Sequence, residues 1–257
     1  MPIYREHTPH PALARHVECY WSIRASVDPA HPVTDRVLPD GCMDIIFGLS
    51  PSASVMGFAP YAIGTMTRPL DVTYSGSVDL FSVRFRPGGA RAFLETEAYE
   101  LTDRITPLGD LWGRPGEELW ERMASATTTG GRVDVLDSTL QARLRQGDGA
   151  DARVLAATEL VAARHGAARV DTMARTAGVS RRQLERHFLA SVGVTPKMAC
   201  RVARFRRAVL LMHGRPATTL SQVAAGAGYA DQPHFTREFR ALAGMTPGAY
   251  LRARSSA

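Results

Sequence analysis

Two segments of the sequence place arginine side chains where they could form paired hydrogen bonds with a planar partner. They read "GVSRRQLERHF" over residues 178–188 and "GYADQPHFTREF" over residues 228–239. A guanidinium group carries a fork of N–H donors that matches two adjacent acceptors, such as O6 and N7 of guanine. If each segment forms a helix, Arg182 and Arg186 in the first and Arg237 in the second lie opposite its apolar residues.

The two segments belong to a longer repeat. Residues matching at an offset of 50 are Ala174/Ala224, Ala177/Ala227 and Gly178/Gly228. Residues matching at an offset of 51 are Leu184/Phe235, Arg186/Arg237, Phe188/Phe239, Gly193/Gly244, Thr195/Thr246 and Pro196/Pro247. The extra residue therefore falls in a turn. Each copy predicts a helix, a glycine turn, a second helix and a Gly-x-Thr-Pro stop. Ser180 and Asp231 stand where helix N-caps are expected, and Pro233 is tolerated in a first turn.

The second helix of each copy has one apolar side and one arginine-rich side. Leu184 and Phe188 in the first copy, like Phe235 and Phe239 in the second, are four residues apart and should face inward. A small helical bundle with a solvated basic face is the alternative for a single copy. The occurrence of two copies favours two helix-turn-helix units. Residues 195–213 predict one long connecting helix, whose apolar stripe is Met198, Val202, Phe205, Val209 and Met212.

Charge divides the chain into two unlike halves. Residues 1–150 hold 14 arginines and 19 acidic residues, a net charge of −5. Residues 151–257 hold 17 basic and six acidic residues, a net charge of +11. We therefore expect only the second half to meet a polyanion, for which RNA or a lipid surface would serve as well as DNA on charge alone.

The composition is that of a globular protein without a membrane span. The 257 residues are 45% hydrophobic and 22% charged, and no apolar run approaches the length of a transmembrane helix. The first residues lack the pattern of a signal peptide, and the three cysteines have no metal-ligand spacing. We expect a cytoplasmic protein with reduced thiols, no cofactor, no metal site, no catalytic residues and no membrane partner.

The first half predicts strands followed by helices. Residues 17–23, 42–49 and 80–86 have strand patterns, the last with Phe81, Val83 and Phe85 on one face of a half-buried strand. The expected organisation is an α+β domain over residues 1–146, strand-rich over 1–87 and helical over 88–146. This domain is followed by a linker over residues 147–150 and by an all-α domain over residues 151–257. The all-α domain should contain two helix-turn-helix units joined by a long helix.

Candidate ligand-binding residues in the first half are Ser82, Arg84 and Arg86, which lie on the strand face opposite the apolar one. Their polar and basic side chains favour the binding of an anionic small molecule or a contact with another subunit. Asp40, Cys42 and Asp44 would share one face of an extended segment. The alternative to a site there is that Asp40 makes a turn, Cys42 is a small buried hydrophobe and Asp44 pairs with an arginine.

Residues 151–254 resemble the DNA-binding domain of the AraC/XylS family of bacterial transcription regulators. The motifs that carry the resemblance are "MARTAGVSRRQLERHFLASVGVTP" and "LSQVAAGAGYADQPHFTREFRALAGMTPGAYLR". The resemblance implies base contacts from Arg182, Glu185, Arg186, Gln232, Pro233, Thr236 and Arg237. It implies phosphate contacts from Ser180, Arg181, Arg207, Asp231, His234 and Arg240. Pro233 departs from the polar residue often found at its position.

The first half resembles an N-terminal domain type that precedes such DNA-binding domains and has no assigned ligand. The segments concerned are "LPDGCMDIIFG", "VRFRPGGARAFL" and "LGDLWG". The family resemblance implies a cupin-like barrel that senses a small molecule and dimerises. It implies double-stranded DNA, read in two adjacent major-groove segments, as the partner, and leaves open RNA polymerase, a small-molecule effector and a homodimer. A regulator without a ligand, and a DNA-modifying or repair enzyme targeted by the repeat, remain the alternatives.

Overall fold

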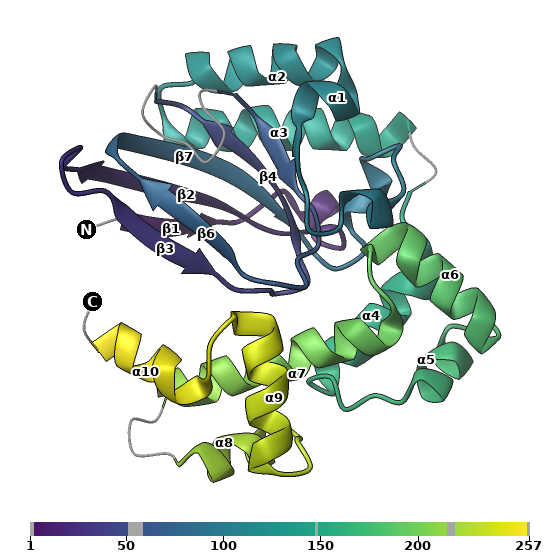
Figure 1. The fold of residues 1–257 in the computed structure, drawn as a ribbon. Helices are drawn as coiled ribbons and strands as arrows, with labels where there is room; N and C mark the ends of the chain where they lie inside the picture. The colour runs from purple at the N-terminus through teal and green to yellow at the C-terminus, as the bar shows by residue number, and fades with distance from the viewer. Residues whose placement is uncertain (1–2, 51–58, 147–148, 215–218, 256–257) are drawn as a thin grey trace.

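The computed structural model describes residues 3–50, 59–146, 149–214 and 219–255, with a β-rich part followed by helices (Figure 1). The strands are β1 Ile3–His7, β2 Val17–Val27, β3 Val33–Val37, β4 Met43–Gly48, β5 Tyr61–Ile63, β6 Leu70–Tyr74, β7 Gly76–Phe85 and β8 Ile105–Pro107. The helices are α1 Leu108–Trp112, α2 Arg114–Ser125, α3 Thr129–Gln146, α4 Ala152–Ala163, α5 Val170–Thr176, α6 Arg181–Val192, α7 Pro196–Gly214, α8 Leu220–Gly226, α9 Gln232–Ala243 and α10 Pro247–Ser255.

The N-terminal part is built on an antiparallel sheet of six strands in the order β1-β2-β7-β4-β5-β8. Helices α2 and α3 cover one face, where Phe81 and Phe85 pack with Leu136 and Leu140 of α3 (Figure 1). A second sheet, β3 with β6, covers the other face. No hydrogen-bonded ladder joins the two sheets within the described ranges. The predicted α+β class is confirmed, and its sheets face each other without a ladder that would close them into a barrel.

The expectation of a half-buried strand at residues 80–86 is wrong. These residues end β7, whose Phe81 face packs on the helices as predicted, but the opposite face is covered as well. Leu80 lies in the core shared with β6, and Ser82 is fully buried. The cover comes from the sheet of β3 and β6; β6 directly precedes β7 in the sequence, whereas β3, with which it pairs, lies about 40 residues earlier. A strand's own alternation carries no information about such a cover.

Helical structure also begins later than residue 88. The segment contains two short 3₁₀ helices, Ala90–Ala92 and Ala98–Leu101, and then returns to the sheet as β8 before α1 begins. Gly89 packs directly on the backbone of His16, where a Cβ atom would lie 2.2 Å from the carbonyl oxygen. The apolar spacing read as a helix therefore belongs to tight turns held against the sheet. Residues 147 and 148 of the expected linker lie outside the described residues.

The C-terminal part contains two small cores that meet on α7. Helices α4, α5 and α6 form the first core, and α8, α9 and α10 pack with α7 in the second. The predicted stripe on α7 is confirmed as core, but it serves mainly the second unit, since Val202, Phe205 and Met212 are buried there. Met198 packs against both cores. The long helix therefore fixes the spacing of the two units.

Candidate nucleic-acid interface

The first helix-turn-helix unit consists of α5, a glycine turn and α6. Gly178 adopts a φ of +65°, which lets the chain reverse between the helices. Ser180 is the N-cap of α6, and its hydroxyl and the Gln183 side chain form a reciprocal capping box. The helix ends at Gly193, with a φ of +85°. The predicted caps and stop of this unit are confirmed.

Helix α6 presents its two sides as its sequence predicts. Leu184 and Phe188 are completely buried against α4 and α5. Arg182 and Arg186 are exposed on the opposite side, free of hydrogen bonds and ion pairs to the described residues. Glu185 is half-buried, and its Oε1 accepts a hydrogen bond of 3.2 Å from Arg181 Nε. The arginine pair is therefore available to a partner.

The second unit repeats this construction with α8 and α9. Gly228 has a φ of +80°, and the connection is one residue longer than in the first unit, as expected. Asp231 caps α9 by accepting a hydrogen bond of 2.6 Å from the backbone N–H of His234. Phe235 and Phe239 are completely buried. Both units thus hold their second helix by two inward side chains four residues apart.

The outward side of α9 is more mixed than that of α6. Arg237 and Pro233 are exposed, and Thr236 is half-buried between them. Gln232 is exposed, and its Oε1 accepts a hydrogen bond of 2.6 Å from Ser221 Oγ at the start of α8. This bond orients the Gln232 amide so that its NH₂ group remains available as a donor.

A cluster of charges ties α9 to the connecting helix. Glu238 accepts hydrogen bonds from Arg201 Nε at 2.7 Å and from Arg204 Nη2 at 3.4 Å. The Glu238 side chain is only 14% exposed, so these two arginines of α7 form structural contacts within the protein. Pairing one buried carboxylate with two guanidinium groups fixes α9 relative to α7.

The six predicted phosphate contacts are in unequal positions. Ser180 and Asp231 already cap their helices through their side chains. Arg181 on α6 and Arg240 on α9 are exposed, and His234 on α9 is half-buried. All three can be reached from the surface, as a phosphate contact requires. Arg207 instead lines a cavity of about 190 Å³ between α7 and the N-terminal part, where its buried Nε has no hydrogen-bond partner. That position is unfavourable for contact with DNA.

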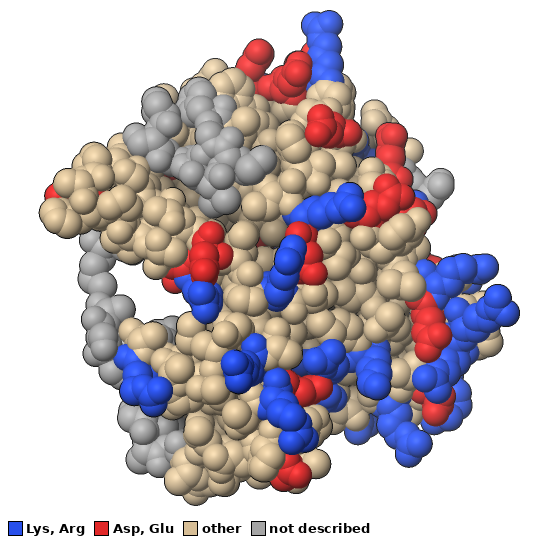
Figure 2. Space-filling model, viewed as in Figure 1, with Lys and Arg blue, Asp and Glu red and all other residues tan. Residues whose placement is uncertain are grey.

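Basic side chains gather over the C-terminal part of the molecule. Figure 2 shows arginine and lysine concentrated in the lower half of the view, where Figure 1 places α4 to α9. Acidic side chains are mixed with them in the upper half. The charge asymmetry read from the sequence is therefore also an asymmetry in space, and the basic part of this view is the part that contains the two helix-turn-helix units.

The N-terminal part packs directly on α6, the candidate recognition helix of the first unit, and no sequence motif predicts this contact. Thr65 Oγ1 donates a hydrogen bond of 2.6 Å to the carbonyl of Val192, the last residue of α6. Thr102 Oγ1 donates one of 2.7 Å to the carbonyl of Gly193. Carbonyls at a helix C-terminus lack partners within the helix, and these threonines supply them. Both threonines lie in connections between strands, where the sequence contains no periodic signal.

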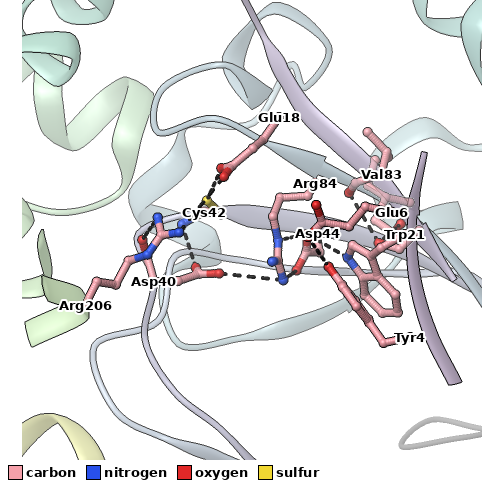
Figure 3. A network of polar contacts seen from close by, with 12 residues as sticks. Tyr4, Glu6, Glu18, Trp21, Asp40, Cys42, Asp44, Val83, Arg84 and Arg206 are labelled. Carbon is pink, nitrogen blue, oxygen red and sulfur yellow. Dashed lines mark hydrogen bonds and ion pairs between the residues drawn. The ribbon is translucent and has the colours of Figure 1, made fainter. Parts of the chain in front are cut away.

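A second contact joins α7 to the turn before β4 (Figure 3). Arg206 Nη1 donates to the carbonyl of Asp40 at 3.3 Å, and its Nη2 lies 4.0 Å from Glu18 Oε1. The Sγ of Cys42 donates to the other oxygen of Glu18 at 3.3 Å. Burial raises the pKa of the Cys42 thiol, so this cysteine is a buried structural group, as the alternative interpretation held.

The three predicted ligand residues have partners within the protein. Ser82 donates to the carbonyl of Ile45 at 2.9 Å, and Arg86 donates to the carbonyl of Ala14 at 2.9 Å. Arg84 forms two hydrogen bonds of 3.2 Å with Asp44. Neither the 190 Å³ cavity nor a larger groove beside α6 is lined by these three residues. A ligand site at Ser82, Arg84 and Arg86 stays a prediction without a cavity to support it.

The predicted turn and ion pair around Asp40 and Asp44 are confirmed. Asp40 Oδ1 accepts a hydrogen bond from the Cys42 N–H, and Asp44 pairs with Arg84 (Figure 3). Burial raises the pKa of the Asp44 carboxyl to about 6, although Arg84 opposes this shift. Asp40 lies 3.6 Å from the same guanidinium, so two carboxylates share one arginine. The described residues contain no group of three or more potential metal ligands.

Family comparisons divide the chain in the same way. Residues 5–107 match a family model described as a domain of unknown function, DUF6597, and residues 173–253 match one described as a helix-turn-helix domain. The HTH-type transcriptional regulator MtrA of Neisseria gonorrhoeae is 32% identical over 81 residues. That match covers 32% of this chain and only 27% of MtrA. No helix in the described ranges is long and apolar enough to cross a membrane.

Three solved structures are similar to this chain over part or most of its length. An AraC-type transcriptional regulator from Chromobacterium violaceum is 30% identical, with 40% of this chain and 90% of that one covered and a TM-score of 0.37. The DNA-binding domain of AdpA, in complex with a target DNA, is 28% identical over 41% and 93% of the two chains, with a TM-score of 0.36. ToxT from Vibrio cholerae is 11% identical over 98% and 97%, with a TM-score of 0.46.

Both resemblances seen in the sequence are therefore confirmed, one for each part of the chain. The matched helix-turn-helix domain includes both α6 and α9, and MtrA, to which this part of the chain is similar, is an HTH-type transcriptional regulator. The C-terminal part of the chain is therefore an AraC-type helix-turn-helix domain.

Proposed function

We propose that this regulator reads two successive major-groove segments of double-stranded DNA, with α6 in one and α9 in the next. The observation that carries the proposal is that one arrangement occurs twice: a helix anchored by two buried side chains presents arginines outward. Because α7 fixes the spacing of the units, the two sites on DNA should lie on one face, about 10 base pairs apart.

The proposed readers differ in chemistry between the units. Arg182 and Arg186 of α6 and Arg237 of α9 carry the guanidinium forks that suit guanine. Glu185 suits a cytosine amino group once Arg181 turns toward a phosphate. On α9, Gln232 and Thr236 are the polar readers, whereas Pro233 offers only an apolar surface, such as a thymine methyl group prefers.

We further propose that a small molecule acting through the N-terminal domain controls this DNA binding. The support is that Thr65, Thr102 and Arg206 connect this domain to both α6 and α7. A change in the domain's position therefore reaches the reading helices directly. We place the domains at 1–146 and 151–257 and the protein in the cytoplasm, with its DNA. The family resemblance leaves open a second copy and RNA polymerase as further partners.

The test is a footprint on the DNA upstream of its own gene, followed by binding measurements with single variants. Arg186→Ala should cost roughly 1–3 kcal/mol on the cognate site and relax base preference in one box only. Arg237→Ala should do the same in the other box. Arg145→Ala removes an equally exposed arginine from α3 and should leave binding unchanged. Equal losses of Arg186→Ala on cognate and random DNA would show that Arg186 contacts only phosphate.

A further inference from the structure

A groove with a volume of about 1290 Å³ runs between the N-terminal domain and the first recognition helix. One wall consists of residues 91–99 and the end of α3. The other consists of the start of α4 and residues 186–191 of α6. Its volume is larger than the roughly 300–1,000 Å³ of a typical small-molecule site, so it has room for one, and it lies where the two domains meet. The sequence offered no indication of it, because its walls come from both halves of the chain.

Two guanidinium groups in this groove lack a hydrogen-bonding partner among the described residues. Arg143, from α3, stacks over the ring of Trp112 at 4.1 Å from the centroid. The stack fixes the guanidinium plane and leaves its N–H edge free. Burial lowers the pKa of Arg143, and Glu95 opposes this shift without forming an ion pair within 4.0 Å. Arg186 contributes the second guanidinium from α6.

Most of the other charged groups of the groove form ion pairs with one another. Arg91 pairs with Glu97 at 3.6 Å. Asp151 accepts hydrogen bonds from Arg153 Nε at 2.9 Å and from His187 Nδ1 at 2.6 Å. Glu95 also lines the groove and lies near Arg143 without forming an ion pair. The four arginines of the groove therefore face three carboxylates, which leaves one net positive charge, and Arg143 and Arg186 are the guanidinium groups without an ion pair among the described residues.

The groove also exposes apolar surface beside these charges. Tyr99 is 51% exposed and Leu189 is 36% exposed, and both line the groove. Phe93 and Leu94 form its floor as buried side chains. A molecule that fits this surface has an apolar body as well as an anionic group, because such a body would cover Tyr99 and Leu189.

We propose that the groove binds an organic anion, a carboxylate or phosphate group on an apolar body, held by Arg143 and Arg186. This inference rests on the proposed function, because Arg186 is also a proposed reader of DNA. One side chain cannot serve both partners at once. The anion therefore competes with DNA for Arg186 and weakens binding at the box read by α6, while the box read by α9 keeps its contacts.

The first experiment measures ligand binding to the full chain without DNA. Thermal shift and calorimetry are run with octanoate, 3-phenylpropionate and phenyl phosphate, and with the alcohols octanol and 3-phenylpropanol as uncharged controls. The anions should stabilise the wild type and the alcohols should not. Arg143→Gln and Arg186→Ala should each weaken anion binding roughly tenfold to a hundredfold, since each removes a charge-assisted hydrogen bond.

Two matched variants separate the groove from general charge effects. Arg145→Ala lies on the same helix as Arg143, and Arg182→Ala lies on the same helix as Arg186, yet neither residue lines the groove. Both should bind the anions as the wild type does. The proposal is overturned if none of the three anions binds at millimolar concentration. It is also overturned if Arg143→Gln and Arg186→Ala bind them normally, since the ligand would then lie elsewhere.

The second experiment measures DNA binding with and without the anion that binds best. Wild-type affinity for the cognate site should fall on adding the anion, with protection lost in the α6 box only. Arg143→Gln should retain its DNA affinity under the same conditions. Failure of the wild type to bind DNA in the absence of anion would contradict the proposed function and not the groove. Equal footprints with and without saturating anion would overturn the competition.

Discussion

The contact between Thr65 and the end of α6 allows a direct test of how firmly the two domains hold each other. Thr65 is 1% exposed, and its hydroxyl donates a hydrogen bond of 2.6 Å to the carbonyl of Val192. Valine has nearly the same shape as threonine, so Thr65→Val removes the donor without opening a cavity. The buried carbonyl loses this partner, which should cost about 1–3 kcal/mol.

Thr102→Val adds a second, related change. Thr102 is only partly buried, so the loss of its bond to the Gly193 carbonyl should cost about 0.5–1.5 kcal/mol. The two carbonyls are adjacent, so the effects should not add fully. We expect the double variant to lose about 2–3 kcal/mol, which multiplies the open fraction of the interface roughly 30-fold to 150-fold.

Hydrogen exchange and chemical unfolding together measure this loss. Exchange at the backbone N–H groups near the end of α6 should accelerate by the factor given above, while the second unit should be little affected. Thr73→Val is the control, because Thr73 is exposed on β6 and its hydroxyl, among the described residues, bonds only to Thr34 within the same small sheet. Exchange rates and stability within a few tenths of a kcal/mol of the wild type would refute the reasoning, since they would mean that the domains do not dock through these threonines.

Three further predictions concern charge, backbone and domain independence. Residues 147–257 alone should bind DNA, with an affinity that falls steeply with salt, measured by titration at several ionic strengths; a folded fragment without affinity at low salt contradicts the domain assignment. Because the pKa of Asp44 is raised from 3.8 to about 6, its contribution to stability is present at low pH and is lost as the pH rises through about 6. The free energy of unfolding, measured at several pH values, should fall between about pH 4 and 6 in the wild type because of Asp44, and this part of the pH dependence should be absent in Asp44→Asn. Gly193→Ala should destabilise the chain more than Gly244→Ala, because a Cβ would lie 2.8 Å from the Ala98 carbonyl at the first position but no closer than 3.3 Å to Pro69 at the second.

The helix-turn-helix units were predictable because their signals are local. A capping residue, an inward pair four residues apart and a positive-φ glycine each act within one turn of helix, so Ser180, Phe188 and Gly193 sufficed to define α6. The same holds for Asp40, whose turn involves only its near neighbours. Local structure of this kind is encoded in consecutive residues and needs no knowledge of the rest of the fold.

The missed features depend on segments far apart in sequence. Ser82 was assigned to an open face because nothing in its own strand shows that β3 and β6 cover it. The helical spacing after residue 88 was real, but the close packing of Gly89 on His16 divides it into short turns. The position of Arg143 in the groove is not predictable from its own segment, because it depends on the ring of Trp112 and on α6 across the groove.

The N-terminal domain meets the two recognition helices at equivalent positions of the repeat. Gly193 ends α6 beside Thr102, and Gly244 ends α9 where a Cβ atom would lie 3.3 Å from Pro69, in the loop before β6. Both glycines were predicted only as helix stops, yet each also allows the other domain to approach. A domain that touches the same point in both units acts on their relative position and not only on one of them. Because recognition of two boxes requires both helices at once, a small displacement of this domain would change affinity for the full site more than affinity for either half.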